Sequence, residues 1–143
     1  MEFNNILCPI EFSENTDKIV ELAIKLSSEN ATITFFHHSV LIYPTDIPNG
    51  FETDQELINL GEKKLKELTD NLSQKNPTRK FAFHHSFVSG ISDEIVEIVA
   101  TQNIDLIVMG THGRTGVSRL LMGSVAEDVL RHSTCPVFFI KIK

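Results

Sequence analysis

The sequence predicts an α/β fold, an open five-stranded and mainly parallel sheet with helices on both faces, and we expect the strand order 3-2-1-4-5. Short apolar runs that fit buried strands alternate along the chain with segments whose apolar residues recur at helical spacing. Turn-forming residues separate these segments, and no tandem repeat or linker interrupts them. Because strands that alternate with helices are joined by right-handed crossovers, they form a parallel sheet that is covered on both faces.

The composition fits one globular domain that spans residues 1–143. Hydrophobic residues make up 41% of the chain and charged residues 22%, which is ordinary for a soluble domain. No apolar run approaches the roughly 18 residues of a membrane span, and the N-terminus lacks a signal-peptide pattern, so we expect a cytoplasmic protein without a membrane partner. The net charge of −6, with no basic stripe to offset it, argues against nucleic acid as a partner. Cys8 and Cys135 are expected to be buried free thiols rather than a disulfide.

The first strand is predicted at Phe3–Cys8, and Pro9 should end its ladder because proline has no N–H group to donate. Ser13 can cap the helix that follows. Four apolar residues of this helix share one face: Ile19, Leu22, Ala23 and Leu26. Ala31–His38 is rich in β-forming side chains and is predicted as the second strand. Residues 39–53 contain two prolines, and we expect an irregular connection that either covers a ligand or is plain surface loop.

A long helix with lysines on one side and small or apolar residues on the other is predicted next, and it should end at Asn76-Pro77-Thr78. Its apolar side consists of Leu57, Gly61, Leu65, Leu68 and Leu72. The third strand is predicted at Arg79–Val88, with alternate side chains on one face: Phe81, Phe83, His85 and Phe87. A further helix is expected to start at Ser92, since acids follow in its first turn, where the helix dipole favours them.

The fourth strand is predicted at Ile104–Met109 and the last strand at Val137–Ile142. Between them a helix should start at Ser124, because Ser124 and Glu127 fit the S-x-x-E capping box. The last strand would lie at an edge of the sheet, and nearly all of its residues are apolar, which invites pairing with another chain. We therefore expect a homodimer joined through residues 137–142. The alternative is that the C-terminus folds over its own edge.

The segment between the fourth strand and the last helix carries the strongest functional signal. Glycines let its backbone approach a ligand, and the first N–H groups of the helix have no partner within the helix. Although the whole chain is acidic, residues 106–126 contain no Asp or Glu and include Arg114 and Arg119. A strand, a glycine-rich loop and a helix start in this order form an anion site, and we expect a nucleotide phosphate there. In the expected strand order, this loop and Pro9–Ser13 flank the point where the order reverses, which is where parallel sheets bind ligands.

The spacing Gly110-x2-Gly113-x9-Gly123-Ser124 resembles the nucleotide-binding motif of the universal stress protein family, and the similarity extends along nearly the whole chain. The resemblance implies a Rossmann-like fold of the adenine-nucleotide-binding type. It also implies bound ATP, AMP or ADP, with or without Mg²⁺, and it agrees with a homodimer. Its nucleotide contacts fall on Pro9, Ile10 and Glu11 near adenine and ribose, on His38 beside adenine, and on Met109, Gly110, Gly113, Gly123, Ser124 and Val125 at ribose and phosphates. Arg114 joins them on the charge argument.

Two of these positions, Glu11 and His38, depart from the family pattern, and a third, Ser124, has two possible roles. ATP-binding members usually have Asp where this chain has Glu11, and the extra methylene could displace a bond to a ribose hydroxyl. His38 replaces a small aliphatic residue, so that it can either stack on a base or crowd it. The hydroxyl of Ser124 can bind a phosphate oxygen or cap its own helix, and it cannot do both fully.

The histidines are not expected to form a metal site. The adjacent pairs His37–His38 and His84–His85 lie on predicted strands, so the two members of each pair point to opposite faces. No Cys, His and Asp spacing resembles that of a zinc site.

For catalysis, the local nucleophile candidates are Ser13 with Glu11 and Ser118 with His112, and neither pair lies in a known catalytic motif. We therefore expect a dimeric, nucleotide-binding sensor or regulator of the stress response, with weak ATP hydrolysis at most. The alternatives are a dimeric interaction module with a non-functional pocket, and a slow ATPase in the same crevice.

Overall fold

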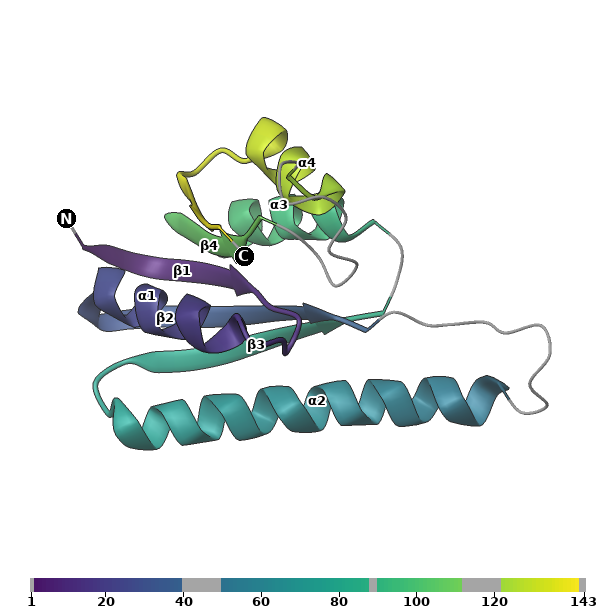
Figure 1. The fold of residues 1–143 in the computed structure, drawn as a ribbon. Helices are drawn as coiled ribbons and strands as arrows, with labels where there is room; N and C mark the ends of the chain where they lie inside the picture. Colours follow the sequence, from purple (N-terminus) through teal and green to yellow (C-terminus); the bar gives the residue numbers. More distant parts are fainter. Residues whose placement is uncertain (1, 40–49, 88–89, 112–121, 142–143) are drawn as a thin grey trace.

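The computed structural model describes residues 2–39, 50–87, 90–111 and 122–141 of the chain. In these residues, five strands alternate with four helices (Figure 1). The elements are β1 Phe3–Pro9, α1 Thr16–Leu26, β2 Ser27–His38, α2 Gly50–Lys75, β3 Lys80–Ser86, α3 Ile91–Thr101, β4 Leu106–Gly110, α4 Ser124–His132 and β5 Val137–Ile140. This alternation confirms the predicted fold class.

The five strands form one sheet in the order β3-β2-β1-β4-β5, and every pair of neighbours in it runs parallel. The predicted strand order is therefore confirmed. β1 is the central strand, and its Leu7 is in register with Thr34 of β2 and with Ile107 of β4. The chain leaves β1 toward β2 and later returns to the other side of β1 as β4. This reversal places the carboxyl ends of β1 and β4 at the point where open parallel sheets bind ligands.

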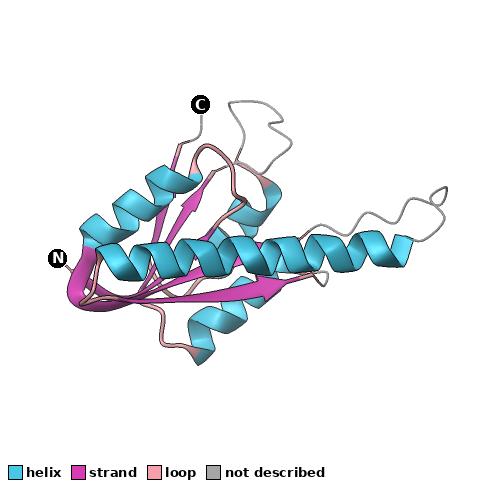
Figure 2. Cartoon of the chain, turned by 90° about the horizontal axis from the view of Figure 1, so that it is seen from below, coloured by secondary structure: helices cyan, strands magenta, loops and turns pink. Residues whose placement is uncertain are grey.

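Alternate residues of β1 pack into two different cores, one on each face of the sheet. Ile6 and Cys8 pack with α1 and α2, whereas Leu7 packs with α3 and α4. Figure 1 shows α3 and α4 together on one side, with α2 running along the other. In Figure 2 the long helix α2 crosses in front of the strands. Ile6 and Leu7 are both fully buried, and burial of a side chain of this size stabilises a fold by about 1.5–3 kcal/mol relative to exposure.

Both cysteines are free thiols, as expected. Cys8 is fully buried beneath α1 and α2, and this burial raises the pKa of its thiol well above the ordinary value. Cys135 is half-buried and not fully buried as predicted, and it forms no disulfide. Because a thiol must ionise to react, Cys8 is part of the core and not a nucleophile.

Several element boundaries differ from those predicted. β2 begins at Ser27, directly after α1, because its first residues already pair with Phe3 of β1. α2 begins at Gly50, so residues 50–53 are helical and not part of an irregular connection. The chain between 50 and 56 carries three acids, which favour a helix start and overcome the low helix propensity of its glycine. Residues 40–49 of the predicted connection and Ile142 of the predicted last strand lie outside the described residues.

The predicted helix caps are wrong in each case. Asn15, not Ser13, occupies the N-cap of α1, while Ser13 lies outside the helix and accepts a bond from the Asn15 amide at 3.3 Å. α3 starts one residue before Ser92, after Gly90, which adopts a left-handed φ of 88° that glycine tolerates best. Cap positions depend on the backbone angles with which the chain enters the helix, and tertiary packing sets those angles.

Candidate functional site

The ligand site is predicted beyond the carboxyl ends of β1 and β4, next to the start of α4. Of the predicted contact residues, the structure describes nine, and it brings them to this edge of the sheet: Pro9, Ile10, Glu11, His38, Met109, Gly110, Gly123, Ser124 and Val125. The predicted contacts Gly113 and Arg114, and also Arg119, lie outside the described residues. The same holds for the candidate pair Ser118 and His112.

On the β1 side, the backbone of the site is fixed by hydrogen bonds to β2. Pro9 does not end the ladder as predicted, because the next amide, that of Ile10, still donates to the carbonyl of Phe36 at 2.8 Å. His37 Nδ1 donates to the carbonyl of Ile10 at 2.9 Å. Glu11 follows directly and its side chain is exposed.

The turn after Glu11 contains a contact that sequence reasoning missed. Phe12 has a positive φ of 54°, which is uncommon for a residue other than glycine and persists where the surroundings hold it. Its ring packs edge-on against His37 at 4.8 Å between centroids, and the ammonium of Lys64 lies 5.6 Å from its centre. The strand period could have placed His37 toward α1 and α2, but no sequence signal marks the left-handed Phe12.

On the β4 side, the two ends of the glycine loop are joined. The amide of Thr111 donates to Ile140 of β5 at 3.1 Å, and the amide of Gly123 donates to the carbonyl of Thr111 at 2.6 Å. Met109 is buried, while Gly110 is only partly covered. The amides of Thr111 and Gly123 are therefore engaged within the protein and do not contribute to an anion cradle.

Among the described residues of this segment, the first turn of α4 supplies further amides. Gly123 is the N-cap, with φ −63° and ψ 157°, and the Glu127 amide bonds to its carbonyl at 2.9 Å. The N–H groups of Ser124, Val125 and Ala126 precede this bond and have no partner within the helix. Together with the positive end of the helix dipole, three such groups are suited to binding an anion.

Ser124 is the first residue of α4 and not its N-cap, so the predicted S-x-x-E capping box does not form. Glu127 instead pairs with Arg131 one turn later, at 2.8 Å between Oε1 and the guanidinium. Within the described part of the chain, the N-cap Gly123 is joined by no side-chain capping bond, and the Ser124 side chain is exposed. Of the two roles left open for this hydroxyl, the structure excludes the N-cap, which Gly123 occupies. Binding of a phosphate oxygen by Ser124 stays a prediction.

His38, the last residue of β2, is half-buried and in register with Ser86 of β3. The structure places it at the same edge of the sheet as Pro9 and Ile10. The predicted opposite orientation of adjacent histidines is confirmed for His84 and His85 on β3. His37 stacks on His85 on one face, and His84 stacks on Phe36 on the other. Among the described residues, no group of three His, Cys, Asp or Glu side chains is arranged to hold a metal ion.

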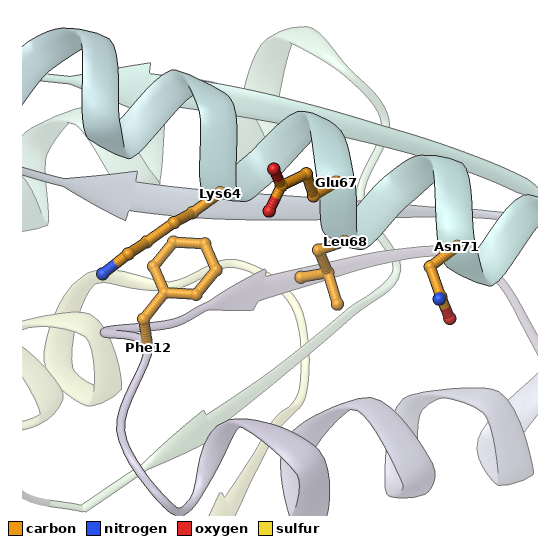
Figure 3. A pocket seen from close by; sticks show the side chains of 5 residues that line it. All are labelled: Phe12, Lys64, Glu67, Leu68 and Asn71. Atoms are coloured by element: carbon orange, nitrogen blue, oxygen red, sulfur yellow. The ribbon is translucent and has the colours of Figure 1, made fainter.

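A hollow of about 480 Å³ lies between α2 and the turn that follows β1, and is lined by Phe12, Lys64, Glu67, Leu68 and Asn71 (Figure 3). It adjoins the turn that carries Glu11 but lies on the α2 side of the sheet, away from the start of α4. Its lining consists of one cation, one anion, one amide and two apolar side chains, so its charge favours no particular ligand. None of the helices in the described ranges is long and apolar enough to cross a membrane.

The family model of the universal stress protein family matches residues 2–141. The chain belongs to the universal stress protein family. Universal stress protein A homolog 1 of Coxiella burnetii is 31% identical over 149 residues, which cover 100% of this chain and 99% of that protein. Universal stress protein MJ0577 of Methanocaldococcus jannaschii is 34% identical over 156 residues, which cover 99% and 96%. The predicted family is therefore confirmed along the length of this universal stress protein.

Solved structures of universal stress proteins share the fold. The structure of MJ0577 superposes with a TM-score of 0.77 at 24% identity and covers 100% of this chain and 99% of its own. The universal stress protein of Archaeoglobus fulgidus, solved in complex with dAMP, has a TM-score of 0.65 at 20% identity, with coverage of 99% and 100%. The Arabidopsis thaliana family protein At3g01520, solved with AMP bound, has a TM-score of 0.66 at 19% identity, with coverage of 98% and 92%.

Proposed function

We propose that this universal stress protein binds an adenine nucleotide in the crevice beyond the carboxyl ends of β1 and β4 and acts in the stress response. The first turn of α4 is the observation that carries the proposal. It offers three amides that precede the first intrahelical bond and an exposed Ser124 hydroxyl, and it follows directly on the joined ends of the glycine loop. An anionic phosphate is the ligand that such a helix start favours.

Two fold neighbours support the same ligand class, since the Archaeoglobus protein was solved with dAMP and the Arabidopsis protein with AMP. We assign the phosphates to the first turn of α4, with Gly113 and Arg114 added from the sequence motif. The ribose is assigned to Glu11, whose exposed carboxylate can accept bonds from its hydroxyls and could also face a Mg²⁺ ion. The base is assigned to the strand ends that carry Pro9, Ile10 and His38.

The direct test is to denature the purified full-length protein and to analyse the supernatant for adenine nucleotides by chromatography. ATP, ADP and AMP are then titrated into nucleotide-free protein, with and without Mg²⁺. A ligand present at 100 times its Kd should stabilise the fold by about 2.7 kcal/mol, a rise in Tm of several degrees. Failure to release any nucleotide, together with an unchanged Tm for all three ligands, would contradict the proposal. Phosphate release during the ATP titration distinguishes a binding protein from a slow ATPase.

We also propose that the protein is a cytoplasmic homodimer that senses the nucleotide and is joined through β5. β5 is an edge strand of the sheet, and Phe138 on it is 45% exposed although it is a large apolar side chain. An apolar edge strand with open backbone groups is suited to pairing with a second copy of the same strand.

Phe138→Glu is expected to convert a dimer into a monomer, because it places a like charge from each copy at the paired edge. Sedimentation or light scattering at micromolar concentration measures the change. Phe83→Glu is the matched control, since Phe83 lies on β3 at the opposite edge and is 40% exposed. A protein that is monomeric before mutation, or that dissociates with Phe83→Glu and not with Phe138→Glu, would rule out this interface.

A further inference from the structure

His85 is buried between α2 and the sheet, outside the candidate nucleotide crevice. Its side chain on β3 is only 3% exposed. Nε2 of the ring lies 2.7 Å from the hydroxyl oxygen of Ser39, at the end of β2. Gly61 of α2 lies directly over this pair, because a Cβ at that position would come within 2.7 Å of the ring and 2.9 Å of the hydroxyl. The Gly61 side of α2 therefore packs directly against the His85 ring and the Ser39 hydroxyl.

The imidazole of His85 can take up a second proton at this position, although its surroundings disfavour the charged form. A neutral imidazole carries one hydrogen, and a hydroxyl can either donate or accept, so the bond to Ser39 forms in either tautomer. Nδ1 has no hydrogen-bond partner in the described structure, and Oε1 of Glu62 on α2 lies 3.9 Å from it. Glu62 is 60% exposed, which leaves its carboxylate able to move toward a protonated ring.

Charged and titratable groups face His85 from each element packed on it. Burial chiefly lowers the pKa of His85 below its ordinary value of 6.5, and Glu62 of α2 opposes this shift. His38 of β2 and His84 of β3 add to the lowering. His37 of β2 stacks on the ring at 5.8 Å between centroids, so two positive charges in this stack would repel each other at short distance.

We propose that His85 is a proton-sensitive latch: its neutral ring holds the Gly61 side of α2 against β2 and β3, and its protonation on acidification loosens that packing. The inference goes beyond nucleotide binding and does not depend on it. The sign follows from linkage, because a state in which α2 has opened binds the proton more tightly than the closed state. Stability of the closed state is full above the ordinary pKa of 6.5, falls as the pH drops below that value, and levels off once the pH passes the lower pKa of the closed state.

The test is hydrogen exchange of the backbone amides of α2 in the full-length protein without nucleotide, between about pH 7.5 and pH 5.5, corrected for intrinsic exchange, with the amides of α3 as internal reference. The opening constant of α2 should rise on acidification by about tenfold for each unit by which the closed-state pKa of His85 lies below its ordinary value. His132→Gln, a change of an exposed histidine on α4, should leave this rise intact.

Two variants should change the rise in the α2 opening constant in opposite directions, and together they test the proposal. His85→Gln keeps a polar group near Ser39 and cannot titrate, so the rise in the opening constant should disappear. Glu62→Gln removes the carboxylate that favours the charged ring, so the rise should become larger. Because the Glu62 side chain is exposed, Glu62→Gln is expected to fold, and it still tests the proposal if His85→Gln does not fold. A rise that persists unchanged in His85→Gln, or that becomes smaller in Glu62→Gln, would overturn the proposal.

Discussion

Replacing Ser124 with aspartate is expected to weaken adenine nucleotide binding by two to three orders of magnitude without destabilising the fold. A carboxylate at this position would lie beside the phosphate that we assign to the first turn of α4. Two like charges about 4 Å apart repel each other by roughly 4 kcal/mol at an effective dielectric constant near 20. In the nucleotide-free protein the same carboxylate meets the positive end of the helix dipole and should stabilise α4 by about 0.3–1 kcal/mol.

Because Ser124→Asp should lower nucleotide affinity but raise the stability of the nucleotide-free protein, a binding defect can be told apart from a folding defect. Isothermal titration measures affinity, and thermal unfolding without nucleotide measures stability. Ser124→Ala should cost about tenfold in affinity, since it removes one hydrogen bond to a charged group. Gln74→Glu, an exposed change near the far end of α2, alters the net charge equally and should leave affinity unchanged. If Ser124→Asp binds nucleotide as tightly as the unmutated protein, then the phosphate does not lie at this helix start.

Substituting Gly61 with alanine should destabilise the protein by up to about 2 kcal/mol, although alanine is the better helix former. Helix propensity alone favours the change by about 1 kcal/mol. A Cβ on Gly61 would, however, lie 2.7 Å from Nε2 of His85 and 2.9 Å from Oγ of Ser39, so the helix or the buried ring must move. Such overpacking costs roughly 1–3 kcal/mol for alanine and more for a larger residue, so that Gly61→Val should be less stable than Gly61→Ala.

Urea unfolding of the nucleotide-free protein measures this loss. The control is a double-mutant cycle with His85→Ala, which removes the ring that the new Cβ would meet. In that background Gly61→Ala should be neutral or stabilising, because the propensity gain remains while most of the clash is gone. Stabilisation of the otherwise unmutated protein by Gly61→Ala would show that α2 does not lie as close to His85 as the structure places it.

The order of the elements and the topology of the sheet could be predicted, because both follow from local patterns repeated along the sequence. Period-two and helical spacings place the strands and helices in alternation, and the crossover rule then leaves few topologies. The N-caps predicted at Ser13 and Ser124 were wrong, because local patterns do not fix the position of a cap. Side-chain type suggests a cap, but backbone angles fixed by distant contacts decide which residue occupies it. Gly123 is placed at its cap by a bond to Thr111, at the other end of the loop.

The amino-acid sequence by itself determined the fold class, the strand order, the family and the helix start on which we place the phosphate, since each rests on spacing between near neighbours in the chain. Only the tertiary structure decided how Ser39 and His85, 46 residues apart, come to share a hydrogen bond beneath Gly61. It also decided that Phe12 takes a left-handed backbone and that His37 holds the carbonyl of Ile10. Close approaches of this kind depend on how whole elements pack against one another, and packing distances are not encoded in any short stretch of sequence.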